Sequence, residues 1–423
     1  MPSLEPIPNR NPNLPDGGSD DEADPELVEL LRQHLGMGGK QQNNLPPETR
    51  VLEGAQYVFD NAIDVALSPA QTKEAAETIW RLMQKKAYST KTWSEHELHP
   101  KTKDENTVDF IFTMDLLNFS FWSDEKDESK RFCIEYRGKK WTGYWSLVAA
   151  LQRALEEGIP ITTPEFWIDE EHCTEEVLRH VFRSATDEEI PLFKKRMQCL
   201  REAGEVLCNE FEGSFVTCVE DANLSAAGLV NLLTENFACF RDETKLNGKR
   251  VRLYKRAQIL VADLWACFDG EDYGEFNDID KITMFADYRI PQMLHQLGCL
   301  RLSPSLESHI RDLKPIPSGS TWEIELRGTS IWCVELIKRE IEKRHPEVKD
   351  AGRKGVTSSE ENTPQDSEVE NEDAEEKTKA EKPAKTYGIN AILIDFFLYD
   401  TMKNLEQEHN ESIPHHRTRS IWY

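Results

Sequence analysis

Two aspartates stand in surroundings that are otherwise almost entirely apolar. Asp287 lies within Phe285-Ala-Asp-Tyr-Arg-Ile-Pro291, at the predicted start of a helix, where the helix dipole and free backbone N–H groups favour an ionised carboxylate. Asp395 lies between Ala391-Ile-Leu-Ile394 and Phe396-Phe-Leu-Tyr399, where a charge is costly unless it is paired or used. A fixed carboxylate in an apolar site can stabilise a positive charge that develops in a substrate, so both are candidate catalytic acids.

Both aspartates also have a purely structural explanation. Asp287 can cap a helix whose first turn contains Pro291, a common arrangement at helix starts. Asp395 can cap a helix or pair with Arg417 or Arg419 near the end of the sequence. The sequence leaves these alternatives open beside catalysis.

Two further charged residues lie in the predicted helix Tyr254 to Phe268. Lys255 is at its start, where a cation gains nothing from the helix dipole, so a bound anion such as a phosphate would account for it. Asp263 lies inside the apolar run of the same helix, and we expect Arg256 or Arg289 to neutralise it.

Metal and disulfide chemistry find little support in the sequence. His96 and His99 are spaced so that both could bind a metal ion from one helical face, but no third ligand lies nearby. The nine cysteines are odd in number and form no Cys-x-x-Cys pair, so we expect reduced core residues. The sequence therefore predicts neither a metal site nor a cofactor.

The composition excludes several classes of partner. With 77 acidic and 51 basic residues the net charge is -26, which opposes binding to duplex DNA or bulk RNA but allows a compact anionic ligand in a local basic pocket. No stretch approaches a membrane span, and residues 1–18 lack the apolar region of a signal peptide. We therefore expect a cytoplasmic or nuclear monomer that acts on a small molecule and contacts neither a membrane nor polymeric nucleic acid.

Two polar segments frame the part of the chain that can form a core. Residues 1–46 are rich in Pro, Asn, Gly and Asp, with one short helical stretch at Pro25 to Leu35, and we expect a disordered N-terminal extension. Residues 350–386 are predicted to be a disordered acidic insertion, because they contain too few large apolar side chains to offset the entropy of ordering. Residues 47–349 and 387–423 are predicted to form a single domain.

Apolar residues recur at helical spacing through most of this domain, and strand patterns are few. One hairpin is expected from Arg131-Phe-Cys-Ile-Glu-Tyr136 through Arg137-Gly-Lys-Lys140 to Trp141-Thr-Gly143. The sequence thus predicts a mostly α fold with a small β element. The predicted helices are Glu48 to Ala66, Ala70 to Lys86, Tyr144 to Glu157, Ile190 to Phe211, Ser225 to Asn236, Tyr254 to Phe268, Ile290 to Leu297 and Ser330 to Arg344.

Several short blocks, in order from about residue 48 to the last residue, resemble the queuosine salvage proteins. The departures are the long N-terminal extension and the acidic insertion, and neither touches a block. The blocks are His96-Glu-Leu-His-Pro100, Leu117-Asn-Phe-Ser-Phe-Trp-Ser123, Gly143-Tyr-Trp-Ser-Leu147, Phe211-Glu-Gly-Ser-Phe215, Phe240-Arg-Asp242, Tyr254-Lys-Arg-Ala-Gln258, Phe285-Ala-Asp-Tyr-Arg289, Glu325-Leu-Arg-Gly328, Ile394-Asp-Phe-Phe-Leu-Tyr-Asp400 and Arg417-Thr-Arg-Ser-Ile-Trp-Tyr423.

The resemblance implies an N-glycosidic hydrolysis, in which queuosine 5′-phosphate gives queuine and ribose 5-phosphate for salvage into tRNA modification. It also implies a fold similar to the helix-hairpin-helix DNA glycosylases, in which an aspartate opens a helix that ends in a turn like Leu297-Gly298. A carboxylate near the anomeric carbon would stabilise the positive charge of the transition state.

The implied site assigns Asp287 to the ribose and Asp395 to the attacking water or the amine of the queuine side chain, and the reverse assignment fits nearly as well. Two other classes stay open: a glycosylase acting on polymeric nucleic acid, which the acidic charge opposes, and a non-enzymatic helical interaction protein. The candidates for holding the base are His96, Phe119, Trp122, Phe285 and Tyr288, and those for the 5′-phosphate are Lys255 and Arg289.

Overall fold

The structure of this chain is a computed structural model that describes residues 46–86, 88, 93, 95–346, 388–410 and 412–423. The chain divides into two units, Met1–Pro46 and Pro47–Tyr423, and every named helix and strand belongs to the second. The helix expected at Pro25 to Leu35 and the insertion expected at residues 350–386 lie outside the described residues. In chain order the elements are α2 (Val51–Asn61), β1 (Val65–Leu67), α3 (Pro69–Lys86), α5 (Glu105–Leu116), η1 (Glu128–Lys130), β2 (Ile134–Tyr136), β3 (Lys139–Trp141), α6 (Tyr144–Glu156), α7 (Pro164–Ile168), α8 (Glu175–Val181), α9 (Phe193–Glu210), α10 (Phe215–Asp221), α11 (Ala226–Asn236), η2 (Ala238–Phe240), β4 (Glu243–Leu246), β5 (Lys249–Arg252), α12 (Lys255–Cys267), η3 (Asp272–Gly274), η4 (Ile279–Lys281), α13 (Arg289–Gln296), β6 (Leu300–Leu302), α14 (Pro304–Arg311), α15 (Thr321–Arg344) and α17 (Ala391–Gln407).

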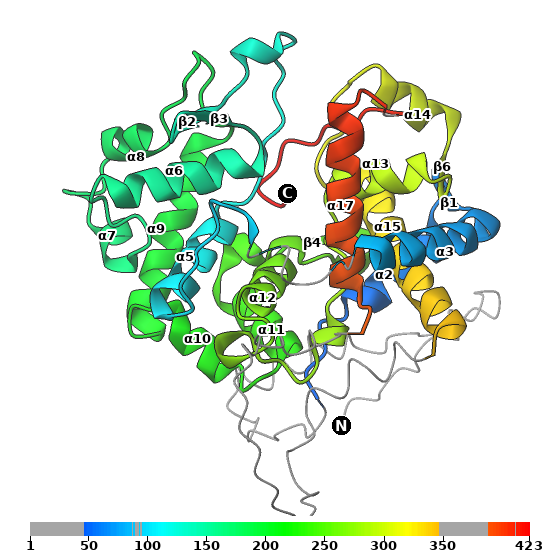
Figure 1. Cartoon of the computed structure of the whole chain (residues 1–423), viewed down its shortest axis with the longest axis horizontal. Coiled ribbons are helices and arrows are strands. Elements are labelled where there is room, and N and C mark those ends of the chain that lie inside the picture. The colour runs from blue at the N-terminus through cyan, green and yellow to red at the C-terminus, as the bar shows by residue number, and fades with distance from the viewer. Residues whose placement is uncertain (1–45, 87, 89–92, 94, 347–387, 411) are drawn as a thin grey trace, which may run out of the picture. The chain divides into compact units, whose positions relative to one another are not determined.

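The helices of Pro47–Tyr423 form two groups with α12 between them (Figure 1). In one group α2, α3, α13 and α17 pack against α15. In the other α6 packs on α8 and on the β2–β3 hairpin, and α7 packs on α9. Because α12 contacts α5 and α11 and is buried along nearly its whole length, it is the element best placed to carry side chains into the interior.

The described strands are short and pair in twos, all antiparallel. The predicted mostly α fold with a small β element is therefore confirmed. The three pairs join β1 to β6 with Val65 opposite Leu302, β2 to β3 with Ile134 opposite Trp141, and β4 to β5 with Glu243 opposite Arg252.

Most predicted helices occur within a few residues of their expected bounds, as α3, α6, α9, α11, α12 and α13. The helix expected from Glu48 to Ala66 ends earlier, at Asn61. The side chain of Glu325 accepts hydrogen bonds from the backbone N–H groups of Asp64 and Val65 at 2.7 and 3.1 Å, and Val65 begins β1. In a longer helix these two N–H groups would instead donate to backbone carbonyls of the preceding turn, so the buried carboxylate favours the end of the helix.

The helix expected from Ser330 begins earlier, at Thr321. Its first turns bury the charged side chains of Glu323, Glu325 and Arg327, which interrupt the apolar periodicity that marks a helix in the sequence. The apolar periodicity therefore did not reveal the first turns of α15, where the helix is most deeply buried.

The sequence analysis predicted no element at α5, α7, α8, α10, α14, the β1–β6 pair or the β4–β5 hairpin, and two of these are informative. α5 is buried on almost every side, so its apolar residues follow no single stripe. The β4–β5 hairpin turns at Asn247-Gly248, whose φ angles of 49° and 81° are those of a two-residue type I′ turn. The Asn-Gly pair was a usable indication of this hairpin.

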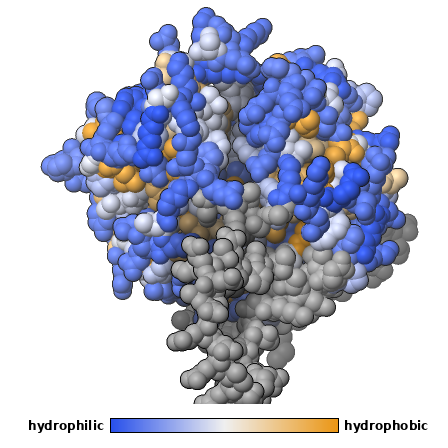
Figure 2. Space-filling model, in the orientation of Figure 1, coloured by the Kyte–Doolittle hydropathy of each residue, from blue (hydrophilic) through white to orange (hydrophobic). Residues whose placement is uncertain are grey.

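The described surface is mainly polar. Hydrophilic side chains cover most of the face shown in Figure 2, and hydrophobic ones occur in separate spots. No helix among the described residues is long and apolar enough to cross a membrane. All cysteines but Cys208 are buried, so the predicted core placement is confirmed for the other eight.

Gly328 lets α15 and α2 approach closely. A Cβ atom at this position would lie 2.6 Å from Cβ of Val58, far inside normal contact. We expect Gly328→Ala to lower the free energy of unfolding by about 1–3 kcal/mol, because an overpacked core must shift backbone or side chains. Urea denaturation followed by circular dichroism measures the change.

Gly54, on the facing helix α2, is the matched control. Its Cβ would meet the nearest atom, the backbone N of Arg252, at 3.4 Å. Gly54→Ala should be neutral or stabilise by up to about 1 kcal/mol, since alanine favours a helix. Equal destabilisation by both substitutions would show that close approach at Gly328 is not the constraint.

Candidate functional site

A cavity of about 470 Å³ lies beside α12 and brings together residues from many parts of the sequence. α12 contributes Lys255, Ile259 and Asp263, whose spacing of four residues places them on one face of the helix. Lys255 and Asp263 are eight residues apart, about 12 Å at the usual rise per residue. The cavity is lined by Tyr88, Trp93, Glu95, His96, His99, Asn118, Phe121, Tyr144, Trp145, Lys255, Ile259, Asp263, Phe285, Asp287, Tyr288, Asp395, Phe396, Tyr399, Asp400 and Tyr423.

Asp287 is both a helix cap and a cavity residue. Its Oδ1 accepts hydrogen bonds from the backbone N–H groups of Arg289 and Ile290 at 2.8 and 2.9 Å, at the start of α13. Both bonds use Oδ1, so Oδ2 has no hydrogen-bond donor among the residues that the structure describes. Burial raises the pKa of Asp287, and the nearby positive charge of Lys255 opposes this rise. The structural and functional explanations of this aspartate are therefore compatible.

Asp395 lies in the second turn of α17 and lines the same cavity. Its Oδ2 accepts a hydrogen bond of 2.9 Å from the backbone N–H of Phe285. Burial, and next the charge of Asp287, raise the pKa of Asp395 well above its ordinary value. Because Asp287 accepts two backbone hydrogen bonds and Asp395 accepts one, a proton added to the pair resides on Asp395. The expected pairing of Asp395 with Arg417 or Arg419 does not occur, since both arginines pair with Asp124.

Lys255 carries an unpaired ammonium group into the cavity. Its backbone N–H donates to Asp242, but its Nζ has no hydrogen-bond partner among the described residues. Burial lowers the pKa of Lys255, and the charges of Asp287, Asp115 and Asp395 oppose this decrease. A buried ammonium without a partner is costly, so the position suits an anionic ligand group.

Asp263 does not pair with either arginine expected from the sequence. The guanidinium of Arg256 donates to backbone carbonyls, including that of Leu116 at 2.6 Å, and Arg289 forms an ion pair of 2.6 Å with Glu406. The predicted pairing of Asp263 with an arginine is wrong because backbone carbonyls, which sequence patterns do not reveal, can also accept the hydrogen bonds of a buried arginine.

Asp263 instead forms a carboxyl pair with Asp115. Its Oδ1 accepts from Trp93 Nε1 at 3.0 Å, and the buried carboxyl group of Asp115, which accepts from Asn118 at 3.0 Å, lies close enough for its charge to act on Asp263. Burial raises the pKa of both carboxyl groups, and the charge of Asp115 raises the pKa of Asp263 further. Since two carboxyl groups buried this close together cannot both ionise without a large cost, the pair shares one proton.

An aromatic wall faces these acids. The rings of His96 and Trp145 stack with centroids 3.2 Å apart and an interplanar angle of 12°. Burial lowers the pKa of His99 to about 3, so its ring is neutral. Nδ1 of His99 lies 2.7 Å from the carbonyl of Trp93 and must donate, which leaves Nε2 to accept from the hydroxyl of Tyr144 at 2.8 Å. Both histidines have aromatic and hydrogen-bond partners, and no group of metal-ligating side chains occurs in the described part of the chain.

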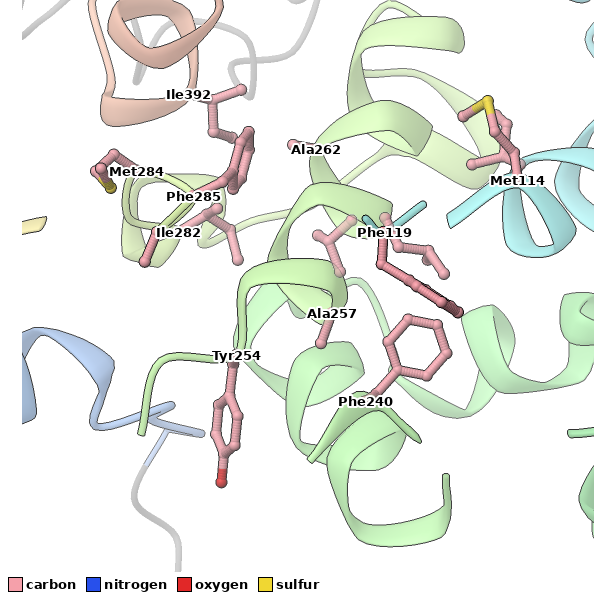
Figure 3. Packing of buried hydrophobic residues seen from close by; sticks show 14 of the residues in the cluster. Met114, Phe119, Phe240, Tyr254, Ala257, Ala262, Ile282, Met284, Phe285 and Ile392 are labelled. Carbon is pink, nitrogen blue, oxygen red and sulfur yellow. The ribbon is translucent and has the colours of Figure 1, made fainter. Parts of the chain in front are cut away.

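The structure brings most of the candidate residues together and leaves three outside the cavity lining. Phe119 is fully buried with its ring between Arg196 and Arg256, and Figure 3 shows it with Phe240 across α12 from Phe285. The ring of Phe119 therefore packs in the core and is not available to a ligand in the cavity. The candidates that line the cavity are His96, Lys255, Phe285, Asp287, Tyr288 and Asp395.

Trp122 and Arg289 also have structural partners. Trp122 donates from Nε1 to the carbonyl of Thr418 at 3.0 Å, and Arg419 lies 3.5 Å from its ring centroid. Arg289 is occupied by its ion pair with Glu406. Neither side chain lines the cavity.

The sequence analysis missed several cavity residues. Asn118, Tyr144, Trp145, Tyr399 and Tyr423 lie in blocks quoted for the resemblance, so their positions carried some indication. Trp93 became recognisable only through the buried carboxyl pair that it contacts.

A cavity with aromatic walls, partly protonated acids and one unpaired lysine has the features of a binding site for a small, polar, aromatic molecule. The family model described as queuosine salvage protein matches residues 98–423, and the chain belongs to that family.

Similar proteins match over nearly the whole of their own length. A protein of Nematostella vectensis is 40% identical over 371 residues, which cover 88% of this chain and 97% of that protein. One of Schizosaccharomyces pombe is 39% identical over 388 residues, covering 89% and 100%. One of Bos taurus is 39% identical over 373 residues, covering 88% and 98%. All three are named queuosine 5′-phosphate N-glycosylase/hydrolase.

The shared proton of Asp115 and Asp263 makes stability depend on pH. A carboxyl group whose pKa is raised on folding contributes stability below its unfolded pKa, and this is lost as the pH rises through the folded pKa. Asp115→Asn keeps the shape and supplies an N–H donor for Asp263. We expect its free energy of unfolding to fall less steeply than that of the wild type between about pH 5 and 8.

Urea denaturation at several pH values measures this difference, which cannot exceed about 1.4 kcal/mol per pH unit for one proton. Asp124→Asn, at an exposed side chain with 73% relative accessibility, serves as the control and should follow the wild-type slope. Identical slopes for Asp115→Asn and the wild type would argue against the shared proton.

Proposed function

We propose that this protein hydrolyses the N-glycosidic bond of queuosine 5′-phosphate, releasing queuine and ribose 5-phosphate. The observation that carries the proposal is Asp287, a buried carboxyl group that is held through one oxygen by two backbone N–H groups and lines the cavity near Lys255. The names of the relatives support the same reaction. The cavity volume of about 470 Å³ suits a single nucleotide.

In this proposal Asp287 faces the anomeric carbon of the ribose. As the bond from C1′ to the base nitrogen breaks, positive charge develops on the sugar, and the ionised carboxylate stabilises it. The oxygen of water forms the new bond to C1′ and loses a proton to a carboxylate or to solvent, while the base nitrogen keeps the electron pair of the broken bond and takes up a proton. Hydrogen bonds at the helix start hold Asp287 in place before the reaction, so little reorganisation is required.

Asp395 is the proton-carrying partner. The base of queuosine is a 7-deazaguanine, so the ring position that purine-releasing enzymes often protonate is a carbon, and departure must be assisted at another edge. The raised pKa of Asp395 keeps its carboxyl group protonated when Asp287 is ionised, which suits it to donate a hydrogen bond to the departing base. The alternative role, recognition of the side-chain amine, requires the ionised form.

The remaining cavity residues fit binding roles. His96, Phe285 and Tyr288 offer aromatic surfaces for the base, and Lys255 supplies the cation for the 5′-phosphate. We propose that the substrate is a free nucleotide, with no polymeric nucleic acid, membrane or cofactor involved. We also propose a monomer that acts in the cytoplasm or nucleus and supplies queuine for tRNA modification.

We further propose a relation in fold to the helix-hairpin-helix DNA glycosylases. The supporting feature is α13, which opens with the capping aspartate Asp287 and ends at Leu297-Gly298, where Gly298 has a φ of 71°. The mainly helical architecture agrees with such a relation, although fold alone would not assign the reaction.

Asp287→Asn tests the assignment of the catalytic acid. Asparagine can still cap α13, so the protein should fold, but it cannot supply the negative charge. We expect kcat for queuosine 5′-phosphate to fall by about 10³-fold or more. Release of free queuine, followed by mass spectrometry with purified protein, measures the rate.

Asp109 provides a matched control for this substitution. It also accepts a backbone hydrogen bond at a helix start, from Phe215 at 3.1 Å, and burial raises its pKa to about 6, but it does not line the cavity. Asp109→Asn should keep wild-type kcat. If Asp287→Asn is as active as Asp109→Asn, the catalytic assignment is wrong, and no release by the wild type would reject the enzymatic proposal.

Lys255→Met tests recognition of the phosphate. Loss of one charge-assisted hydrogen bond should reduce kcat/KM for queuosine 5′-phosphate by about 10- to 100-fold, with a much smaller effect on unphosphorylated queuosine. Steady-state kinetics with both substrates separates the two effects.

Lys338→Met is the control, because Lys338 is a largely buried lysine that pairs with Glu335 on α15 outside the cavity. Lys338→Met should leave kcat/KM unchanged for both queuosine 5′-phosphate and unphosphorylated queuosine. Equal losses for both substrates in Lys255→Met, or equal cleavage of both by the wild type, would exclude a phosphate contact at Lys255.

A further inference from the structure

Arg327 of α15 is fully buried at the junction of three segments that form the cavity, although it does not line the cavity itself. Its Nη1 and Nη2 donate to the two carboxylate oxygens of Asp242 at 3.0 and 2.5 Å. Its Nε donates to the carbonyl of Ala286 at 2.8 Å, and Nη1 also donates to Glu323 at 3.1 Å. One rigid guanidinium group therefore joins several segments that are distant in sequence.

The bond to Ala286 fixes the loop that carries Asp287. In this loop the N–H of Phe285 donates to Asp395, and the N–H of Asp287 donates to the carbonyl of Phe285 at 2.7 Å. The carbonyl of Ala286, between these two residues, is held by Arg327. The position of the peptide that precedes Asp287 thus depends on the guanidinium.

The bonds to Asp242 fix the start of α12. The Oδ2 atom that receives Nη2 of Arg327 also accepts the backbone N–H of Lys255 at 3.2 Å. The backbone carbonyl of Asp242 accepts the N–H groups of Leu253 and Tyr254 at 3.0 and 3.3 Å. Asp242 therefore determines where α12 begins, and with it the position of Lys255.

The third connection is to Tyr423. The guanidinium carbon of Arg327 lies 4.4 Å from the centroid of the Tyr423 ring, which lines the cavity, and the backbone oxygen of Tyr423 accepts from Ser120 at 3.1 Å. Arg327 is thus within contact distance of the Asp287 loop, the Asp242 cap and a cavity wall.

We infer that Arg327, together with Asp242, is a positioning residue that sets the placement of Asp287 relative to Lys255. The inference rests on the proposed function, because it assigns the spacing of the group that faces the sugar and the group that holds the phosphate. Guanidinium suits this role because its planar donors bind both carboxylate oxygens and a third acceptor at once, which the single ammonium of lysine cannot do.

Arg327→Lys tests the inference, since it keeps the charge and removes the fixed arrangement of donors. We expect kcat for queuosine 5′-phosphate to fall by about 10²-fold, the usual effect of misplacing a reacting group by roughly 1 Å. KM should change much less, because most binding contacts remain. The acid limb of the pH profile of kcat/KM should also move, since the surroundings of Asp287 change.

Arg201→Lys is the matched control. Arg201, on α9, also donates to backbone carbonyls, those of Trp167 and Cys173, and does not line the cavity. It should keep wild-type kcat and the same pH profile. If Arg327→Lys is folded by circular dichroism and retains wild-type kcat, or loses activity only in proportion to its folded fraction, Arg327 has no positioning role.

Asp242→Asn gives an independent test if Arg327→Lys does not fold. It retains an oxygen that can accept from Lys255 and removes the charged pairing, and the same fall in kcat with little change in KM is expected. Wild-type kcat in folded Asp242→Asn would overturn the inference.

Backbone amide hydrogen exchange separates this inference from the proposed reaction. Both variants should exchange faster than Arg201→Lys at residues 255–258 and 285–290, whether or not the wild type releases queuine. Absence of release by the wild type would refute the proposed function, whereas unchanged exchange in these segments would refute positioning by Arg327.

Discussion

The cavity depends on charged groups that the fold has removed from water. Burial raises the pKa of Asp287, Asp395 and Asp263 and lowers that of Lys255, so each group is costly in its charged form. Protons shared between carboxyl groups, backbone N–H donors and the proximity of one lysine reduce this cost. The same desolvation makes the remaining charges more effective toward a ligand, because little water competes with them.

The parts of this site that sequence could predict are those set by local patterns. Asp287 was recognisable because its helix start and Pro291 are adjacent in sequence, and Lys255 because a cation is unfavourable where α12 begins. The partner of Asp263 was not predictable, because Asp115 is distant in the chain and no periodic pattern relates the two. Phe119 and Trp122 belong to an aromatic run that looks like a ligand site, yet nearby arginines and a backbone carbonyl occupy them.

The fold shows the same division between local and distant determinants. Helices with one apolar stripe, such as α3 and α6, were predicted nearly to their ends, because burial of a single face produces a clear period. The predicted helix for α15 was too short because Glu323 and Arg327 are charged yet buried. The predicted helix for α2 was too long because Glu325, whose side chain binds the residues that follow α2, lies far away in sequence. Charged residues that act inside the core are the ones that sequence patterns misplace, and one of them, Arg327, contacts the cavity residue Tyr423.

The double use of Asp287 limits what can replace it. One oxygen closes the first turn of α13, and the residue also lines the cavity, so in the proposed mechanism the side chain must be short enough for the turn and acidic enough for the sugar. Serine and asparagine meet the first requirement, whereas glutamate meets the second but reaches one methylene too far. Aspartate is thus the single natural side chain that satisfies both requirements. Fewer substitutions should be tolerated at this position than if the residue served only as a helix cap or only as an acid.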